Sequence, residues 1–433
     1  MLVKVEDLSR PHARSGGFFT PKGETLCVAA KASQSKALGF LIERGVNANA
    51  TKHKGENTLY VAAKSGQPKS VETLLASGAN VNTRITRNGY TALFNTLIAF
   101  RPSVATETSS KIAEILLSHG ANINTTAFNG DQLLHLAITK KYRNREVVRL
   151  LLTRGASVDA RDRSNKTTLI LTSIRREPII ADYLLSFGAN IQATNTAGYD
   201  ALCLAAVELD IRREHSTANA ALLVDILSAH SADINGERQA VPPIILAFRH
   251  QSLNTEPSRD LAYTIIKALL DAGADVERPD IVGFTPLHRW LEIKQFSTFQ
   301  ILALLLERGA NADKASPLGR TPLTYTCSTG REYNTYHRIK VVKLLIVYSA
   351  NIHAPNKNRD TPVIALLFNS EINKENKLEL TNTLTETNVE INVIEHPEVP
   401  RMYRGSIQRN FIAASNKNFK SSDEDLSGEY KST

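Results

Sequence analysis

The chain has 433 residues, a formal charge of +9 at pH 7 and a hydrophobic content of 42%, which is enough to bury a sizeable core. Its longest apolar runs, such as ILALLL, are far shorter than the roughly 20 residues that a membrane helix needs. The first residues, MLVKVEDLSRPHARSGG, hold no apolar run of signal-peptide length. We therefore expect a soluble chain with no membrane contact.

After a polar stretch over residues 1–22, one sequence pattern recurs about ten times. Each copy opens on a motif such as GETLCVAA, GENTLYVAA or GRTPLTYTC and closes on one such as LLASGANVN. Successive openings are separated by between 32 residues (Gly23 to Gly55) and 43 residues (Ala240 to Gly283). The openings fall at Gly23, Gly55, Gly89, Gly130, Asn165, Gly198, Ala240, Gly283, Gly319 and Arg359.

The eighth copy, which begins GFTPLHRWLEIKQFSTFQILALLLERGAN at Gly283, shows what each copy encodes. Thr285 can cap a helix through its hydroxyl, and Pro286 suits the first helical position. The spacing of the apolar residues that follow predicts one short helix and then a second over about residues 299–307. Gly309 then allows a left-handed turn at little cost.

The motifs GFTPLH and LLLERGAN, in this order and about twenty residues apart, resemble an ankyrin repeat. The resemblance implies an all-α ankyrin-repeat solenoid of stacked helix–turn–helix units with projecting β-turn fingers. We expect the array to span residues 23–394, between an N-terminal lead-in (1–22) and a partly disordered C-terminal tail (395–433). Such arrays bind other proteins through a concave face and through the projecting turns.

Several copies depart from the pattern. Four carry extra residues between the two helices, which we expect to form loops: RPSVATETSS, DIRREHSTA, NTEPS and GREYNTYH. Ser231 and Ser349 stand where other copies have the turn glycine, at a cost of roughly 1–2 kcal/mol if the backbone is left-handed there. The seventh copy opens on AVPPIILAF, so we expect the stack to be least regular, with a bend or weak joint, near residues 228–245.

We expect no enzyme, because the residues outside the array are few and the sequence has no P-loop, HExxH or GxSxG motif. No cofactor or metal ligands are assigned, since Cys27, Cys203 and Cys327 are far apart and fall on core-facing helices. The resemblance implies that His135 and His288 hydrogen-bond locally and order their turns. A hydrolase using Cys203 with His215, or Cys327 with His337, is the less favoured alternative.

Basic residues predominate at the predicted turn tips. A row of positive tips would steer an acidic protein surface, although a solvated edge that only keeps the chain soluble is an equal alternative. Apolar tips are the sharper indication of contact. The candidate partner-binding residues are Lys52, Lys54, Arg84, Arg87, Phe128, Arg161, Arg163, Arg278, Ile281, Lys314, Leu318 and Lys357.

The sequence therefore predicts a monomeric, non-catalytic scaffold or adaptor that binds an acidic protein surface in a reducing compartment, the cytoplasm or the nucleus. The irregular repeat lengths are similar to those of pathogen effectors that act on host proteins in the host cytoplasm. Binding of an acidic or nucleic-acid ligand through the basic edge is the alternative. Nucleic acid is disfavoured because the aromatic residues do not alternate with the basic ones as stacking platforms would.

Overall fold

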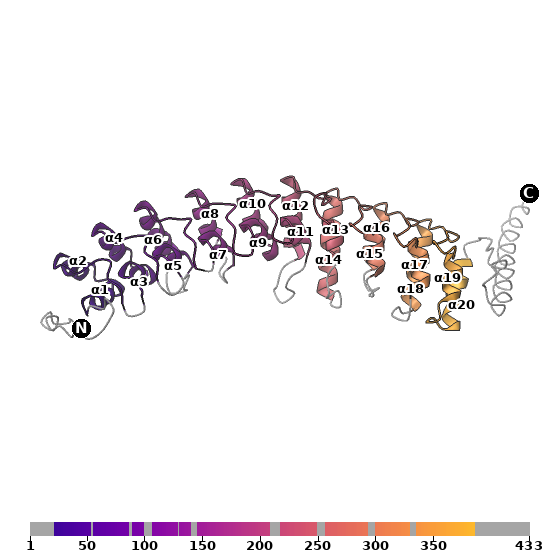
Figure 1. Cartoon of the computed structure of the whole chain (residues 1–433), viewed down its shortest axis with the longest axis horizontal. Helices are drawn as coiled ribbons and strands as arrows, with labels where there is room; N and C mark the ends of the chain where they lie inside the picture. Colours follow the sequence, from indigo (N-terminus) through magenta and orange to yellow (C-terminus); the bar gives the residue numbers. More distant parts are fainter. Residues whose placement is uncertain are drawn as a thin grey trace, which may run out of the picture. The chain divides into compact units, whose positions relative to one another are not determined.

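The computed structural model describes residues 21–385, except 53–54, 86–88, 99–105, 129, 140–144, 208–216, 249–255, 293–298 and 330–334. These residues form ten helix pairs and no strands beyond isolated bridges (Figure 1). They fall into two compact units, residues 1–201 and 202–433. The all-α repeat architecture is confirmed. The predicted tail and all but the last two residues of the lead-in lie outside the described residues.

Each pair has a short first helix and a second helix of variable length. The first helices are α1 (Pro21–Lys31), α3 (Thr58–Lys64), α5 (Ala92–Ile98), α7 (Leu133–Thr139), α9 (Thr168–Arg175), α11 (Ala201–Ala206), α13 (Pro243–Leu246), α15 (Pro286–Glu292), α17 (Pro322–Ser328) and α19 (Pro362–Phe368). The second helices are α2 (Ser35–Glu43), α4 (Pro68–Ala76), α6 (Thr106–Ser118), α8 (Arg145–Thr153), α10 (Pro178–Ser186), α12 (Thr217–Ala229), α14 (Glu256–Asp271), α16 (Phe299–Glu307), α18 (Thr335–Val347) and α20 (Lys374–Thr385).

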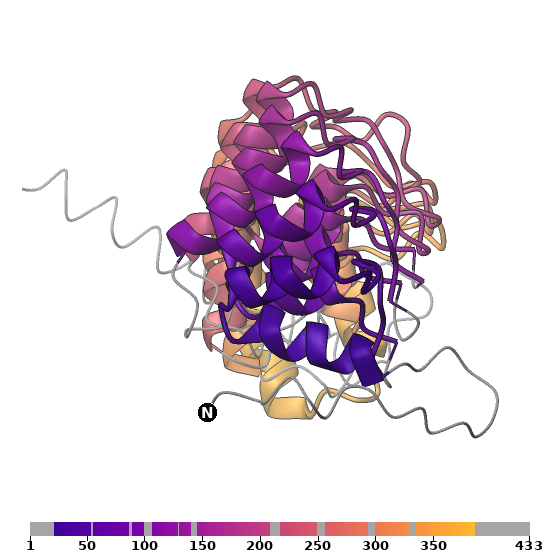
Figure 2. The same cartoon turned by 90° about the vertical axis from the view of Figure 1, so that its left-hand side faces the viewer.

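In nine of the ten described pairs the two helices pack on each other, and most helices also pack on a counterpart in an adjacent pair. In the first unit α1, α3, α5, α7 and α9 contact one another in series; in the second unit α13, α15, α17 and α19 do the same. Viewed from the end, each unit has its helices on one side and the loops that join successive pairs on the other (Figure 2). No pair buries its apolar stripe alone, so the stability of each repeat depends on its neighbours.

The eighth pair forms as its sequence predicts. Helix α15 begins at Pro286, and the Thr285 hydroxyl accepts a hydrogen bond from the His288 backbone N–H at 3.4 Å. Leu287, Trp290 and Leu291 are buried, and α16 covers the predicted residues 299–307. The chain then turns at Gly309 with φ +90°. These elements follow from local signals, namely a cap, an apolar stripe and a turn glycine.

The expectation that the extra residues between helices form loops was only partly correct. Four second helices, α6, α12, α14 and α18, have 13 to 16 residues, against nine in α4, α8, α10 and α16. In α18 the added turn places Arg338 only 2% exposed, and its guanidinium donates to the carbonyls of Thr326 (3.0 Å) and Thr329 (2.7 Å). These two carbonyls at the C-terminal end of α17 stabilise the buried guanidinium.

Two further departures match the sequence analysis. Ser231 and Ser349 have φ angles of +63° and +64°, so they occupy the left-handed turn position that glycine holds in other copies. Helix α13 has only four residues, following Val241-Pro242, which confirms that the seventh copy opens irregularly. The weak joint expected there stays a prediction.

A ladder of side-chain hydrogen bonds joins successive pairs. In seven closing motifs, the second Asn of GANxN, or the acid that replaces it, accepts a hydrogen bond from a backbone N–H of the next pair. In the first unit the acceptors are Asn49, Asn82, Asn124 and Asp159, whose donors are Asn80 (2.7 Å), Asn122 (2.7 Å), Ser157 (2.8 Å) and Asn190 (2.9 Å). In the second unit they are Asn235, Glu277 and Asp313, whose donors are Asp275 (2.7 Å), Asn311 (2.8 Å) and Asn351 (2.6 Å). The ladder fixes the register between pairs and so positions the loops that leave it.

Candidate functional site

Five of the turns that join successive pairs are five-residue fingers that the structure describes in full, and each is closed by hydrogen bonds. In each, the first residue's N–H donates to the fifth residue's carbonyl, at 2.9 to 3.0 Å. The first side chain also accepts hydrogen bonds from within the finger, as Asx turns do. The fully described fingers are 162–166 and 195–199 in the first unit, and 280–284, 316–320 and 356–360 in the second. The predicted projecting turns are thus present, with a fixed backbone.

Successive fingers also touch. A Cβ on Gly283 (φ +96°) would lie 2.9 Å from Pro317 Cγ, and one on Gly319 would lie 2.1 Å from Lys357 Cγ. In the first unit the same relation holds between Gly130 and Arg163, at 2.6 Å. Glycine is therefore required at Gly283 both for its backbone angle and for the close approach of the next finger.

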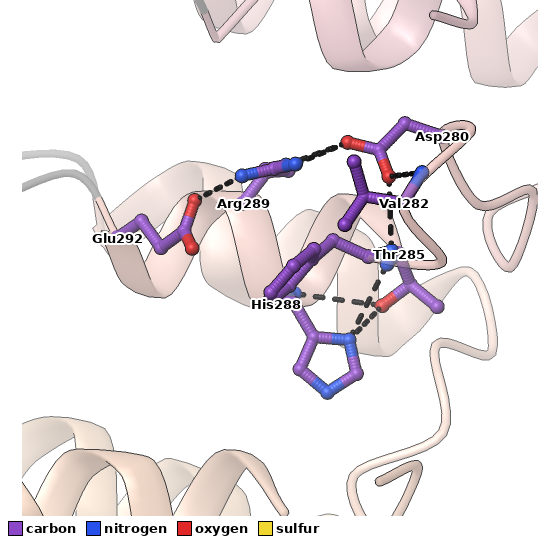
Figure 3. A network of polar contacts seen from close by, with 7 residues as sticks. Asp280, Val282, Thr285, His288, Arg289 and Glu292 are labelled. Carbon is purple, nitrogen blue, oxygen red and sulfur yellow. Dashed lines mark hydrogen bonds and ion pairs between the residues drawn. The ribbon is translucent and has the colours of Figure 1, made fainter. Parts of the chain in front are cut away.

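The finger 280–284 has the most extensive support (Figure 3). Asp280 Oδ1 accepts from the N–H groups of Val282 and Phe284, both at 3.0 Å, and Asp280 Oδ2 accepts from Arg289 Nε at 2.8 Å. Arg289 in turn donates to Glu292 at 2.6 Å and stacks over the Phe284 ring at 4.3 Å. Burial by itself would raise the pKa of Asp280, but the hydrogen bonds from Arg289 and Phe284 outweigh it and hold that pKa below its usual value.

The two histidines of the LLH and PLH motifs connect the first helix of their own repeat to the segment that follows its second helix. His135 Nδ1 accepts from the Gln132 N–H at 3.1 Å, and its Nε2 lies 2.9 Å from the Ala160 carbonyl. His288 Nδ1 lies 2.8 Å from the Thr285 hydroxyl, and its Nε2 lies 2.9 Å from the Lys314 carbonyl. This pattern fits a neutral ring with its proton on Nε2, and burial lowers the pKa of both histidines. Their roles are structural.

The apolar candidates are exposed at finger tips. The exposed fractions are 80% for Ile281, 61% for Leu318 and 50% for Phe128. Val282, which the sequence analysis did not single out, is 57% exposed beside Ile281. Part of Phe128 covers Gly89, because a Cβ there would lie 2.7 Å from its ring, so Phe128 serves packing as well.

The basic candidates divide into three groups. Arg84, Arg161, Arg163, Lys314 and Lys357 are exposed, Lys52 and Arg278 are half-buried, and Lys54 and Arg87 lie outside the described residues. Several are tied to the fingers rather than free. Lys52 pairs with Glu56, Lys314 with Glu277 at 3.5 Å, Arg161 donates to the Asn165 and Thr194 carbonyls at 2.8 Å, and Lys357 donates to the Pro317 carbonyl.

The cysteines lie in the core as free thiols, as predicted. Burial raises the pKa of Cys27, and it raises the pKa of Cys327 to about 12. A thiol with so high a pKa has almost no thiolate to act as a nucleophile. His337 stacks on Phe299 with ring centroids 5.8 Å apart, and His215 lies outside the described residues.

Two further classes of site are absent from the part of the chain that the structure describes. There, no three His, Cys, Asp or Glu side chains come together as a metal ion would need. No helix among the same residues combines the length and apolar character required to cross a membrane.

In a comparison with known proteins, the chain matches two family models. The first, ankyrin repeats in three copies, matches residues 26–124, and the second, a single ankyrin repeat, matches residues 129–163 and 318–357. The chain is also similar to the human protein named Ankyrin repeat and SOCS box protein 6, with 33% identity over 122 residues, and to its Pongo abelii counterpart, with 32%. The matched stretch covers 27% of this chain and 28% of each relative, so the chain spans less than a third of the curated relatives it matches.

Proposed function

Because this chain is an ankyrin-repeat protein, we propose that it is a non-catalytic adaptor that binds a partner protein through the tips of its fingers. The observation that supports this proposal is that each finger has a hydrogen-bonded backbone and exposed side chains at its tip. The backbone and the first side chain are held by hydrogen bonds, whereas the side chains at the tip point to solvent. A surface held in one conformation loses little entropy on binding.

The charge of the first unit's tips favours an acidic partner. Arg84, Arg161 and Arg163 are all exposed, and Arg161 is anchored by backbone carbonyls that leave its charge unneutralised. Aligned positive charges raise the rate of encounter with a negative surface. The same surface would serve an adaptor in its own cell or an effector in a host cell, because it acts by binding alone.

The groups most able to do chemistry are used for structure, which favours the non-catalytic assignment. His135 and His288 hold the turns of their own repeats in their neutral form, and Cys327 is buried with a raised pKa. Asp280 is committed to its finger and to Arg289.

A charge-reversal comparison tests the basic-tip proposal. Proteins captured with the full chain from a cell lysate would be identified, purified and measured against the variant Arg84→Glu/Arg161→Glu/Arg163→Glu. We expect affinity to fall at least about tenfold, mainly through slower association, and the salt dependence to weaken. The matched control is Lys69→Glu/Lys111→Glu/Arg149→Glu, three exposed positions on α4, α6 and α8.

Equal losses in the two triple variants would show that net charge, and not the tips, controls binding. Duplex DNA is a second probe in the same assay. Preferential binding of DNA, with affinity falling steeply as salt rises, would replace the protein-binding proposal with the nucleic-acid alternative.

A further inference from the structure

We propose that the second unit carries a separate docking element, the apolar tips Ile281, Val282 and Leu318, which binds an acidic amphipathic helix of a partner protein. This apolar tip patch rests on the proposed function, since it names the chemistry of one partner segment. It differs from the basic tips of the first unit in location and in chemistry.

The three side chains come from two fingers that touch. Pro317 approaches Gly283 so closely that a Cβ there would lie 2.9 Å from Pro317 Cγ. Ile281 and Val282 are next to that glycine in one finger, and Leu318 is next to that proline in the other. The two fingers are therefore in contact, and their exposed apolar residues lie on adjacent tips and not at scattered positions, which would need no explanation.

Hydrogen bonds to the backbone of the finger 280–284 hold the patch in place. The Ile281 N–H donates to the Ala240 carbonyl at 3.0 Å, which ties the finger 280–284 to the preceding turn. The Val282 N–H is held by Asp280, which Arg289 fixes in turn (Figure 3). Ile281 and Val282 thus remain 80% and 57% exposed on a backbone with little freedom to turn them inward. Preorganised apolar side chains of this kind are suited to binding.

Corresponding positions of the other fully described fingers are polar or small, although Phe128 in the first unit is an exposed apolar tip. The tip residues are Arg-Ser-Asn at 163–165, Thr-Ala-Gly at 196–198 and Lys-Asn-Arg at 357–359, against Ile-Val-Gly at 281–283 and Pro-Leu-Gly at 317–319. The finger backbone tolerates polar tips, so folding does not require apolar ones. Burial of apolar residues by a partner is the interaction that such tips can provide.

The surroundings of the patch favour a negatively charged partner. Of the nearby carboxylates, Asp280 is paired with Arg289 and Glu277 with Lys314 at 3.5 Å, whereas Asp313 accepts the Asn351 N–H and keeps its charge. Lys357 and Arg359 are exposed on the adjoining finger, and Lys357 donates only to a carbonyl oxygen there. At the other end, exposed Glu237 is offset by exposed Arg238. Apolar side chains with positive neighbours match an apolar segment that carries acids.

The spacing of the fingers favours a helix. Stacked helix pairs lie about 10 Å apart, so tips on successive fingers have a similar separation. Residues seven apart in an α-helix share a face and rise about 10.5 Å along it. We therefore assign the partner segment as an acidic helix with large apolar residues at positions i and i+7.

A selection experiment tests this assignment. A random peptide library displayed on phage would be selected on the full chain, and the enriched peptides measured by fluorescence anisotropy. We expect acidic sequences with large apolar residues seven apart, and at least tenfold weaker binding to Ile281→Ser/Leu318→Ser. The control Val347→Ser removes a side chain that is 75% exposed on α18, and it should leave binding unchanged. All three positions are exposed, so unfolding midpoints should match the unmodified chain.

The proposal would be overturned if the selection enriched no peptides, or only basic or uncharged ones. It would also be overturned if the enriched peptides bound the double variant as tightly as the unmodified chain. A dimer in sedimentation that the double variant dissociates would also overturn it, because the patch would then be a contact between two copies. The basic-tip proposal fails on a different result, indifference of the captured partner to reversal of Arg84, Arg161 and Arg163, so the two failures are distinguishable.

Discussion

The fingers 162–166 and 280–284 share one backbone and differ in what they present. In both, the first aspartate accepts from two N–H groups of its own turn, at 2.8 Å in the first and 3.0 Å in the second. The first finger presents Arg163, Ser164 and Asn165, whereas the second presents Ile281 and Val282. Tip chemistry is therefore independent of the turn that carries it, which lets one array hold two kinds of binding surface.

The two fingers also differ in their support. Asp280 is buried and paired with Arg289, which is itself linked to Glu292, while Asp162 is half-buried and serves its own turn. The apolar finger thus has stronger internal support than the charged one. The comparison is tested by substitutions that distinguish the turn hydrogen bonds, which both fingers have, from the pairing with Arg289, which only the finger 280–284 has.

The largest expected effect comes from removing the two aspartates. Asp280→Ala takes away two turn hydrogen bonds and leaves Arg289 without its buried partner, so we expect a loss of about 2–4 kcal/mol. Asp162→Ala removes only the turn hydrogen bonds, and the loss should be about 1 kcal/mol. Urea unfolding of the two variants measures the difference. Equal losses would show that the Arg289 pair adds nothing to the finger.

A smaller effect on the free energy of unfolding is expected at the turn that follows a second helix, where most copies have glycine and two have serine. Ser231 and Ser349 are left-handed at φ +63° and +64°, and Gly188 of the first unit is at φ +81° with open space around the missing Cβ. Ser231→Gly and Ser349→Gly should each raise the free energy of unfolding by about 1 kcal/mol. Gly188→Ser, the reverse change, should lower it by a similar amount. A loss of stability in the glycine variants would mean that the serine side chains make a compensating contact.

The smallest expected effect is a pH dependence shared by the two units. Burial lowers the pKa of His135 and of His288, so the unfolded chain binds more protons than the folded chain below about pH 6.5. The stability that the neutral rings confer is complete above that pH and is lost as the pH falls toward their lower folded-state pKa values. Urea unfolding at pH 7.5 and 5.5 should show a smaller pH-dependent loss in His135→Gln and His288→Gln. His353→Gln, at an exposed position, is the control and should leave the dependence unchanged.

The sequence predicted the features that depend on neighbouring residues. Thr285, Pro286 and Gly309 mark the ends of helices through local geometry, and the exposure of Ile281 and Leu318 follows from their place at turn tips. The left-handed Ser231 and Ser349 were also predictable, because they align with glycines in the other copies.

Features that depend on residues about one repeat apart were missed. The ladder from Asn49 to Asn80, and from Asn82 to Asn122, joins residues 31 and 40 apart, although the recurrence of the second Asn in GANxN was a visible signal. Burial of Arg338 depends on two carbonyls at the C-terminal end of α17, 12 and 9 residues earlier in the chain, that no local pattern reveals. Val282 carries the same local signal as Ile281, an apolar residue in a turn that joins two repeats.

Hydrogen–deuterium exchange of the full chain, free and bound to a captured partner, tests the central claim most directly. If the finger tips are the binding surface, protection on binding will concentrate in peptides covering residues 161–166, 280–284 or 316–320. Peptides from the second helices α4, α8, α10 and α16 will change little. Protection confined to those helices, with the fingers unchanged, would contradict the account.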